Sequence, residues 1–250
     1  VIGITGPPGA GKSTLINALL TVLSEKNRIA VLAVDPTSPF NFGSLLGDRI
    51  RMSSQFNNPN VYIRSVATRG SLGGLSAKTI EMVDVLKSSN FDYIFVETVG
   101  VGQSEIEIVG LADISIVVLV PEAGDDIQSI KSGLMEIADI FVVNKADRAG
   151  AKSFVNHLKK LSIHQEKNIS VLETVADKNI GIKELLNVVN DFKTTKSSKK
   201  SYLYSEKAYK LIQEHRMKSI DKEKLQQEIA EAIQLSDFNL YQYIEKFKNS

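Results

Sequence analysis

A glycine-rich loop near the start of the chain carries residue types that can hold phosphate groups. Residues 6–13 match the pattern G-x-x-x-x-G-K-[ST] and directly follow an apolar run at residues 1–4. The backbone N–H groups of such a loop point at bound phosphates, and the following helix adds its N-terminal dipole. Apolar residues at helical spacing follow the loop, which favours a nucleoside triphosphate site over an ordinary glycine-rich turn.

Two side chains of this loop have distinct expected roles. Lys12 would reach the β- and γ-phosphates, and the Ser13 hydroxyl would ligate Mg²⁺. The residues expected to line the phosphates are Gly9, Ala10, Gly11, Lys12, Ser13 and Thr14.

A second motif, N-K-x-D, indicates which base is bound. Asn144, Lys145 and Asp147 follow a segment, residues 138–143, that we predict to be a buried strand. The Asp147 carboxylate can accept from both N1–H and the 2-amino group of guanine, and facing adenine it would be left unpaired. A second base contact would come from the Ala176 backbone N–H, although Val175 stands where related proteins usually carry serine. Together with the phosphate loop, the motif favours guanine recognition over a simple polar turn.

Acidic residues at the ends of predicted strands are candidates to hold Mg²⁺. Asp35 ends the second predicted strand, Asp48 lies in the loop-rich stretch that follows, and Glu97 ends the predicted strand 93–97. Mg²⁺ prefers a near-octahedral set of oxygens and usually keeps several waters. Each acid alone could be a helix cap or a surface charge, but their shared position at strand ends predicts a metal role together with Ser13.

The segment after Glu97 predicts slow hydrolysis. Residues 97–103 occupy the place of a D-x-x-G element, in which the Gly100 N–H would sense the γ-phosphate. Val101 stands where small GTPases of the Ras type carry the glutamine that orients water, and Gln103 is displaced by two residues. Because valine cannot position a water molecule, we expect weak intrinsic activity that a partner completes.

The elements that would position these residues alternate along the chain. Apolar segments predicted as strands are residues 1–5, 29–34, 61–66, 93–97, 114–120, 139–143 and 169–174. Helical patterns lie between most of them, for example at residues 77–86 and 182–189. This alternation predicts an α/β fold of the P-loop NTPase type: a mostly parallel sheet with helices on both faces and ligands at the carboxyl ends of the strands.

The end of the chain differs from the rest. Residues 1–192 form the predicted nucleotide domain, 193–201 are polar and are predicted to be a linker, and 202–250 show helical patterns only. Two apolar stripes occur in this small all-α segment, formed by Leu225, Ile229, Ala232 and Ile233, and by Tyr241, Ile244 and Phe247. The stripes need a cover, either the nucleotide domain or a second subunit in a homodimer.

Composition excludes several classes of protein. With 30 basic and 29 acidic residues, the net charge of +1 offers no general attraction to nucleic acid or to a membrane surface. The chain has no cysteine, which excludes disulfides and thiolate metal sites, and its three histidines lack metal-ligand spacing. No membrane-spanning run or signal peptide is visible. We expect a cytoplasmic protein, or a mitochondrial-matrix one if a targeting segment precedes Val1.

Taken together, the motifs resemble those of the methylmalonyl-CoA mutase-associated GTPases of the MeaB/ArgK type. The resemblance runs through essentially the whole chain. The segments that carry it are residues 6–14, 33–39, 43–52, 69–75, 97–105 and 124–131. Members usually carry a helical segment before the first strand, which is not seen here.

The resemblance implies a site and a role. Ser13, Asp35, Asp48 and Glu97 would form the Mg²⁺ shell, and residues 124–131 would be a third switch whose polar residues are Asp125, Gln128 and Lys131. The C-terminal helices would form a homodimer arm. Such GTPases assist cofactor loading and protection of an adenosylcobalamin-dependent acyl-CoA mutase, so adenosylcobalamin would be held by the partner.

Two alternatives share the architecture. One is a metal-insertion GTPase, although relatives of that type usually carry the Cys/His clusters that this chain lacks. The other is a P-loop kinase or ATPase linked to basic amino-acid transport. For Lys131, charge neutralisation during phosphoryl transfer competes with the simpler role of a solvated helix residue.

Overall fold

The computed structural model describes most of the chain. The described residues are 1–35, 52–67, 77–98, 108–122, 134–164, 169–192, 199–234 and 238–247. They divide into two compact units, Val1–Lys207 and Ala208–Ser250. Each unit is treated by itself below.

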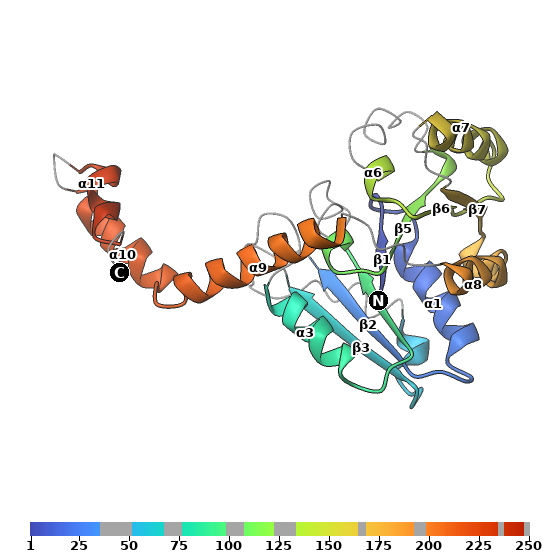
Figure 1. The fold of residues 1–250 in the computed structure, drawn as a ribbon, viewed down its shortest axis with the longest axis horizontal. Helices are drawn as coiled ribbons and strands as arrows, with labels where there is room; N and C mark the ends of the chain where they lie inside the picture. Colours follow the sequence, from blue (N-terminus) through green and yellow to red (C-terminus); the bar gives the residue numbers. More distant parts are fainter. Residues whose placement is uncertain are drawn as a thin grey trace. The chain divides into compact units, whose positions relative to one another are not determined.

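The first unit is built on one parallel sheet of seven strands (Figure 1). The strands are β1 Ile2–Thr5, β2 Ile29–Asp35, β3 Val61–Ala67, β4 Tyr93–Glu97, β5 Ile114–Leu119, β6 Ile140–Val143 and β7 Ser170–Glu173. Their order is β3-β2-β4-β1-β5-β6-β7, so β1 lies in the centre between β4 and β5. The predicted α/β fold is confirmed, and each predicted strand is present with ends that differ by at most one residue.

Helices cover both faces of this sheet. The helices are α1 Lys12–Leu23, α3 Ala77–Lys87, α6 Met135–Ile137, α7 Ala151–His164 and α8 Ile182–Asp191, with 3₁₀ turns η1 Ser53–Gln55, η2 Ile108–Gly110 and η5 Ala176–Lys178. The apolar sides of α1 and α8 pack on one face, in a core that includes Val31 and Val118. The other face is covered by α3 over Leu32 and by α7 over Leu119. Alternate strand residues thus serve opposite cores, which explains why the strands are continuous apolar runs.

The topology of the sheet predicts that a ligand binds at the carboxyl end of β1. In an open α/β sheet, ligands bind beyond the carboxyl ends of the strands where the strand order reverses. Here the chain passes from β1 to β2 on one side of the sheet and from β4 to β5 across β1 to the other. The glycine-rich loop follows β1 directly and leads into α1.

In the described part of the chain after residue 198, three helices are present. Helix α9 spans Lys199–Met217 and crosses the boundary between the units, and α10 Lys222–Ala232 and α11 Leu240–Glu245 lie in the second unit. Residues 199–201 of the predicted linker are therefore helical, because lysine is a good helix former and nothing in these residues breaks a helix. Residues 193–198 of that linker lie outside the described residues. Among the described residues, no helix has both the length and the apolar composition needed to cross a membrane.

Local contacts hold the second unit together. Asp221 caps α10 by accepting from the backbone N–H groups of Glu223 and Lys224, and Asn239 caps α11 in the same way. The Tyr243 hydroxyl donates to Glu228 Oε2 at 2.6 Å. Lys246 Nζ donates to the same oxygen at 2.8 Å. No residue of α10 or α11, both wholly described, is buried within the chain.

Candidate nucleotide site

The loop after β1 approaches its neighbours too closely for any residue but glycine at two positions. Gly6 has φ +138°, and a Cβ there would lie 2.0 Å from the carbonyl oxygen of Val118 on β5. Gly11 has φ +88°, and a Cβ there would lie 2.4 Å from Asn144 Nδ2. These positive φ angles are rarely adopted by residues with side chains. The loop is therefore packed against the end of β5 and against the first residue of the N-K-x-D motif.

A buried positive charge lies inside this loop. Lys12 Nζ donates to the carbonyl oxygens of Gly6 and Pro7 at 2.8 and 3.2 Å. Helix α1 starts without a side-chain cap and without an acidic residue in its first turn. A helix start of this kind, next to an ammonium group, suits an anionic group such as phosphate.

The hydroxyl and carboxylate predicted to hold Mg²⁺ are brought together. Ser13 Oγ donates to Glu97 Oε1 at 2.8 Å, and both side chains are buried. This pair fits the ion, because hydroxyl and carboxylate oxygens are the ligands that Mg²⁺ accepts and waters or phosphate oxygens fill its other positions. Asp35 ends β2 next to β4, but its side chain and all of Asp48 lie outside the described residues. The described residues include no cluster of three histidine, cysteine, aspartate or glutamate side chains suited to a metal ion.

A pair of threonines links the segment that carries Glu97 to the phosphate loop. Thr98 follows Glu97 and Thr5 precedes Gly6, and the Thr98 hydroxyl donates to Thr5 Oγ1 at 2.8 Å. The Thr98 backbone N–H also donates to the carbonyl oxygen of Ile4 at 3.0 Å. Both threonines are buried, so this contact fixes the position of Glu97 relative to the phosphate loop. Sequence reasoning missed it, and the only signal was a threonine beside each motif.

The first two residues of the N-K-x-D motif bind the phosphate loop. Asn144 Nδ2 donates to the Ala10 carbonyl oxygen at 3.0 Å, and Lys145 Nζ donates to that of Gly9 at 2.8 Å. Asn144 Oδ1 also accepts from the Thr174 hydroxyl and from the Ala176 backbone N–H, each at 3.1 Å. Asn144 therefore connects the phosphate loop with the loop after β7. The Ala176 N–H, predicted to contact the base, is used here for that connection.

The last residue of the motif has an ionic partner. Asp147 Oδ2 accepts from Lys178 Nζ at 2.7 Å, and this hydrogen bond lowers the pKa of Asp147 and raises that of Lys178. Lys178 ends the 3₁₀ turn η5, two residues after Ala176. No motif marked this lysine, although a basic residue so close to Ala176 was a usable signal.

The remaining predicted residues are placed only in part. Thr14 lies in the first turn of α1 and is partly buried. Four further residues predicted to act at the site lie outside the described residues: Gly100, Asp125, Gln128 and Lys131. Val101 and Gln103, named for the missing water-orienting group, also lie outside them.

A parallel sheet with this loop at the end of its central strand defines the protein as a P-loop NTPase. The chain belongs to the family of methylmalonyl-CoA mutase-associated GTPases, because the model of that family, MeaB, matches residues 1–234. The family expected from the motifs is thereby confirmed.

Individual relatives agree with this assignment. A Pyrococcus abyssi protein, named as a predicted GTPase, is 52% identical over 199 residues, which cover 76% of this chain and 61% of the relative. GTPase ArgK of Escherichia coli is 39% identical over 202 residues, covering 77% of this chain and 61% of ArgK. The crystal structure of a protein named LAO/AO transport system kinase superimposes with a TM-score of 0.62 and 26% identity, over 99% of this chain and 80% of that one. The chain spans about three fifths of the length of these two curated relatives.

Proposed function

We propose that this chain binds and hydrolyses GTP and serves as a chaperone of an adenosylcobalamin-dependent acyl-CoA mutase. One observation carries the nucleotide part. Asn144 and Lys145 bind the carbonyl oxygens of Ala10 and Gly9, which supports one nucleotide site made of the base motif and the phosphate loop. The spacing between a guanine contact at Asp147 and the phosphates is then set by the protein alone.

The described residues suggest how the triphosphate would be held. Lys12 would exchange the carbonyl oxygens of Gly6 and Pro7 for phosphate oxygens, and the backbone N–H groups of residues 9–14 would face the phosphates. Ser13 and Glu97, completed by Asp35 and Asp48, would hold Mg²⁺, which supplies charge neutralisation at the β- and γ-phosphates when bound.

Hydrolysis would be slow in the isolated protein. Val101 supplies no group that orients water next to Gly100, where the γ-phosphate would be sensed. We assign Asp125, Gln128 and Lys131 to a loop that a bound mutase presses toward the nucleotide, where Lys131 neutralises charge on the phosphoryl oxygens.

The proposed partner is supported by the family and the proposed assembly by the C-terminal helices. Its name associates it with methylmalonyl-CoA mutase. Adenosylcobalamin would be held by the mutase and not by this chain. The apolar stripes of the C-terminal helices, none of whose residues is buried within the chain, support a homodimer, since each stripe would be covered by a second copy.

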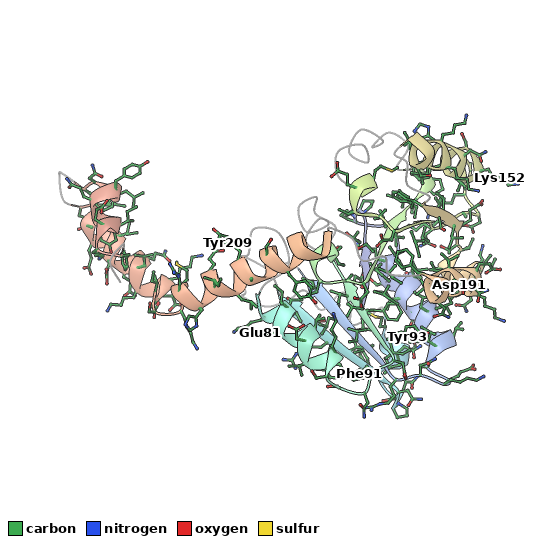
Figure 2. The ribbon with its side chains drawn as sticks, viewed as in Figure 1. Glu81, Phe91, Tyr93, Lys152, Asp191 and Tyr209 are labelled. Carbon is green, nitrogen blue, oxygen red and sulfur yellow. The ribbon has the colours of Figure 1, made fainter. Side chains whose placement is uncertain are left out.

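The base is tested by calorimetry with GDP, a non-hydrolysable GTP analogue and ADP. We expect a strong preference for the guanine nucleotides, and Asp147→Asn should transfer it to xanthosine diphosphate, because the new amide donates to the 2-oxo group. Asp191→Asn is the matched control, since Asp191 is the last residue of α8 and η5 lies before its first residue. Asp191 is labelled in Figure 2. Equal affinity of the native protein for ADP and GDP would overturn the proposal.

The partner is tested by single-turnover GTP hydrolysis with and without methylmalonyl-CoA mutase. We expect stimulation of the native protein and of the control Lys152→Ala, whose side chain is exposed on α7 (Figure 2). Lys131→Ala should lose the stimulated rate only. Equal stimulation of all three proteins would remove Lys131 from the mechanism, and no stimulation at all would remove the mutase.

A second candidate function is a kinase. It is favoured by the match to the LAO/AO transport system kinase, which covers 99% of this chain. A kinase would transfer the γ-phosphate to a protein acceptor, whereas a GTPase releases it as inorganic phosphate. Phosphate release that accounts for all of the consumed GTP would exclude the kinase.

A further inference from the structure

A lysine outside the recognised motifs contacts the carboxylate that is proposed to recognise the base. Lys178 Nζ lies 2.7 Å from Asp147 Oδ2. The two side chains are 57% and 44% exposed, so the pair lies at the surface. Lys178 comes from η5 after β7, and Asp147 comes from the loop after β6. The contact therefore bridges the two loops that would surround a base.

The backbones of the two loops are already held together without this pair. Ala146 N–H donates to the Thr174 carbonyl oxygen at 3.0 Å, which joins the two loops, and within the second loop Lys178 N–H donates to the Val175 carbonyl oxygen at 3.0 Å. Ala176 N–H is bound to Asn144 Oδ1. Because the backbone near Lys178 is fixed relative to Asp147, only the two side chains must be ordered to form the pair, which lowers its entropic cost.

The other charges nearby differ from Lys178 in their contacts. Arg148 acts on Asp147 only through space, since its guanidinium binds the carboxylate of Glu122. Asp177 lies next to Lys178 and contributes to the raised pKa of the lysine. Among the described residues, Lys178 is thus the cation that donates a hydrogen bond to Asp147.

A carboxylate that recognises guanine must present both oxygens at a set angle. The terminal torsion of aspartate is broad, so an unrestrained carboxylate turns easily. Each carboxylate oxygen has two acceptor sites, so Oδ2 can accept from Lys178 and from a base amine at the same time. We propose that Lys178 is a positioning residue for base recognition. Its ammonium group holds the Asp147 carboxylate so that both oxygens meet N1–H and the 2-amino group of guanine.

This inference rests on the proposed guanine specificity and adds a pH dependence. Hydrogen bonding to Lys178 lowers the pKa of Asp147, so the carboxylate stays charged to a lower pH. Without the lysine, Asp147 would take up its proton at a higher pH, with Arg148 as the remaining nearby cation. Loss of GDP affinity on acidification should then begin at a higher pH.

The test compares Lys178→Met, Lys178→Arg and the control Lys183→Met, whose lysine is exposed on α8. Each protein is titrated with GDP, with inosine diphosphate, which lacks the 2-amino group, and with ADP. For Lys178→Met we expect a loss of about two- to fivefold in GDP affinity, the size usual for an exposed ion pair. Inosine diphosphate needs only one carboxylate oxygen and should lose less. Lys178→Arg and Lys183→Met should bind GDP as the native protein does.

The outcomes separate the inference from the function on which it rests. Equal losses for GDP and inosine diphosphate in Lys178→Met, or no loss at all, would overturn the positioning role. A gain in GDP affinity would also overturn it, because the lysine would then compete with the base. A native protein that does not prefer GDP to ADP would instead contradict the proposed function.

Discussion

The two units of the chain are stabilised in opposite ways. In the first, apolar side chains from strands and helices are buried in three cores, and distant segments are joined by buried hydrogen bonds such as Thr98 to Thr5. In the second, α10 and α11 contain no residue buried within the chain. Their order depends on helix caps and on the Glu228–Tyr243–Lys246 contacts. Large apolar side chains such as Tyr209, labelled in Figure 2, remain exposed.

The difference indicates which unit can hold a preformed binding site and which one needs a partner surface. A unit with its own cores can hold a preformed site, because the groups around the phosphate loop are positioned by packing. A unit whose described helices α10 and α11 bury no residue gains order when another surface covers it, so its stability should depend on protein concentration or on a partner. Nucleotide binding should therefore persist when the second unit is perturbed.

The largest expected difference lies in the cost of removing an aromatic ring. Phe141 on β6 is fully buried, and Phe141→Ala should lower the free energy of unfolding by about 3–5 kcal/mol. Tyr241 is 77% exposed, and Tyr241→Ala should cost no more than about 0.5 kcal/mol in dilute protein. Urea denaturation measures both. A large cost for Tyr241→Ala that appears only at high protein concentration would show that a second copy covers the ring.

Two glycines of the phosphate loop allow its packing against Asn144 to be tested. Gly9 and Gly11 both have positive φ, but a Cβ at Gly9 meets nothing within 4 Å. Gly9→Ala should cost only the left-handed strain, about 1–2 kcal/mol. Gly11→Ala adds the clash with Asn144, for a total of about 2–4 kcal/mol, and should greatly weaken GDP binding. Equal thermal unfolding and equal GDP affinity of the two variants would contradict the proposed packing of the loop.

The threonine pair should show a coupling of about 1–3 kcal/mol. Thr98→Val leaves the buried Thr5 hydroxyl without its donor, whereas the double valine variant removes both groups and should be less destabilised than the sum of the single variants. Thr98→Val should also slow Mg²⁺-dependent hydrolysis more than it weakens GDP binding, with recovery in Thr98→Ser. Additive unfolding energies would contradict the coupling.

The caps of the second unit should each contribute about 1 kcal/mol. Asp221→Ala and Asn239→Ala remove the acceptors for the first N–H groups of α10 and α11. Faster amide exchange is expected in those helices, with unchanged exchange in β1 and unchanged GDP affinity. Asp221→Ser keeps a capping oxygen and is the control. A weaker GDP affinity in either alanine variant would contradict the independence of the units.

The smallest effect should be a pH dependence confined to the second unit. Lys246 and Tyr243 lower the pKa of Glu228 below its ordinary value of 4.5. A lowered folded-state pKa gives stability that is present above the unfolded pKa and is lost as the pH falls through the folded one. The protection factors of the α11 amides, which are corrected for the intrinsic exchange rate at each pH, should therefore fall below about pH 4.5, and less so in Glu228→Gln, which has no charge to lose. The same pH dependence in Glu228→Gln would show that another group is responsible.

Some features could be predicted from the sequence because they are local. The strands are buried on both faces, so their apolar runs mark them to within one residue, and the phosphate loop is defined by its own spacing. The order of the strands depends on pairings such as Ile4 with Glu97, which no local pattern encodes.

The contacts of the site were less predictable than its residues. The N-K-x-D pattern predicts that Asn144 and Lys145 serve nucleotide binding, but it does not predict their hydrogen bonds to the carbonyl oxygens of Ala10 and Gly9. The contacts of Lys178 and Thr98 could not be predicted, because their partners, Asp147 and Thr5, belong to other segments. The spacing of residues along the chain does not indicate such contacts.

The central place of β1 has a consequence for the synthesis of the protein. This strand is made before every other strand of the sheet, yet both of its neighbours come much later, as the 93 residues between Thr5 and Thr98 show. At about 5–20 residues per second, a ribosome needs about 5–20 s to cover that distance. During this time β1 is without both of its neighbouring strands, and the phosphate loop is without the end of β5 and the N-K-x-D motif that it packs against. We therefore expect that nucleotide cannot stabilise a half-made chain, and that the nascent protein is most prone to aggregation until β4 and β5 are made.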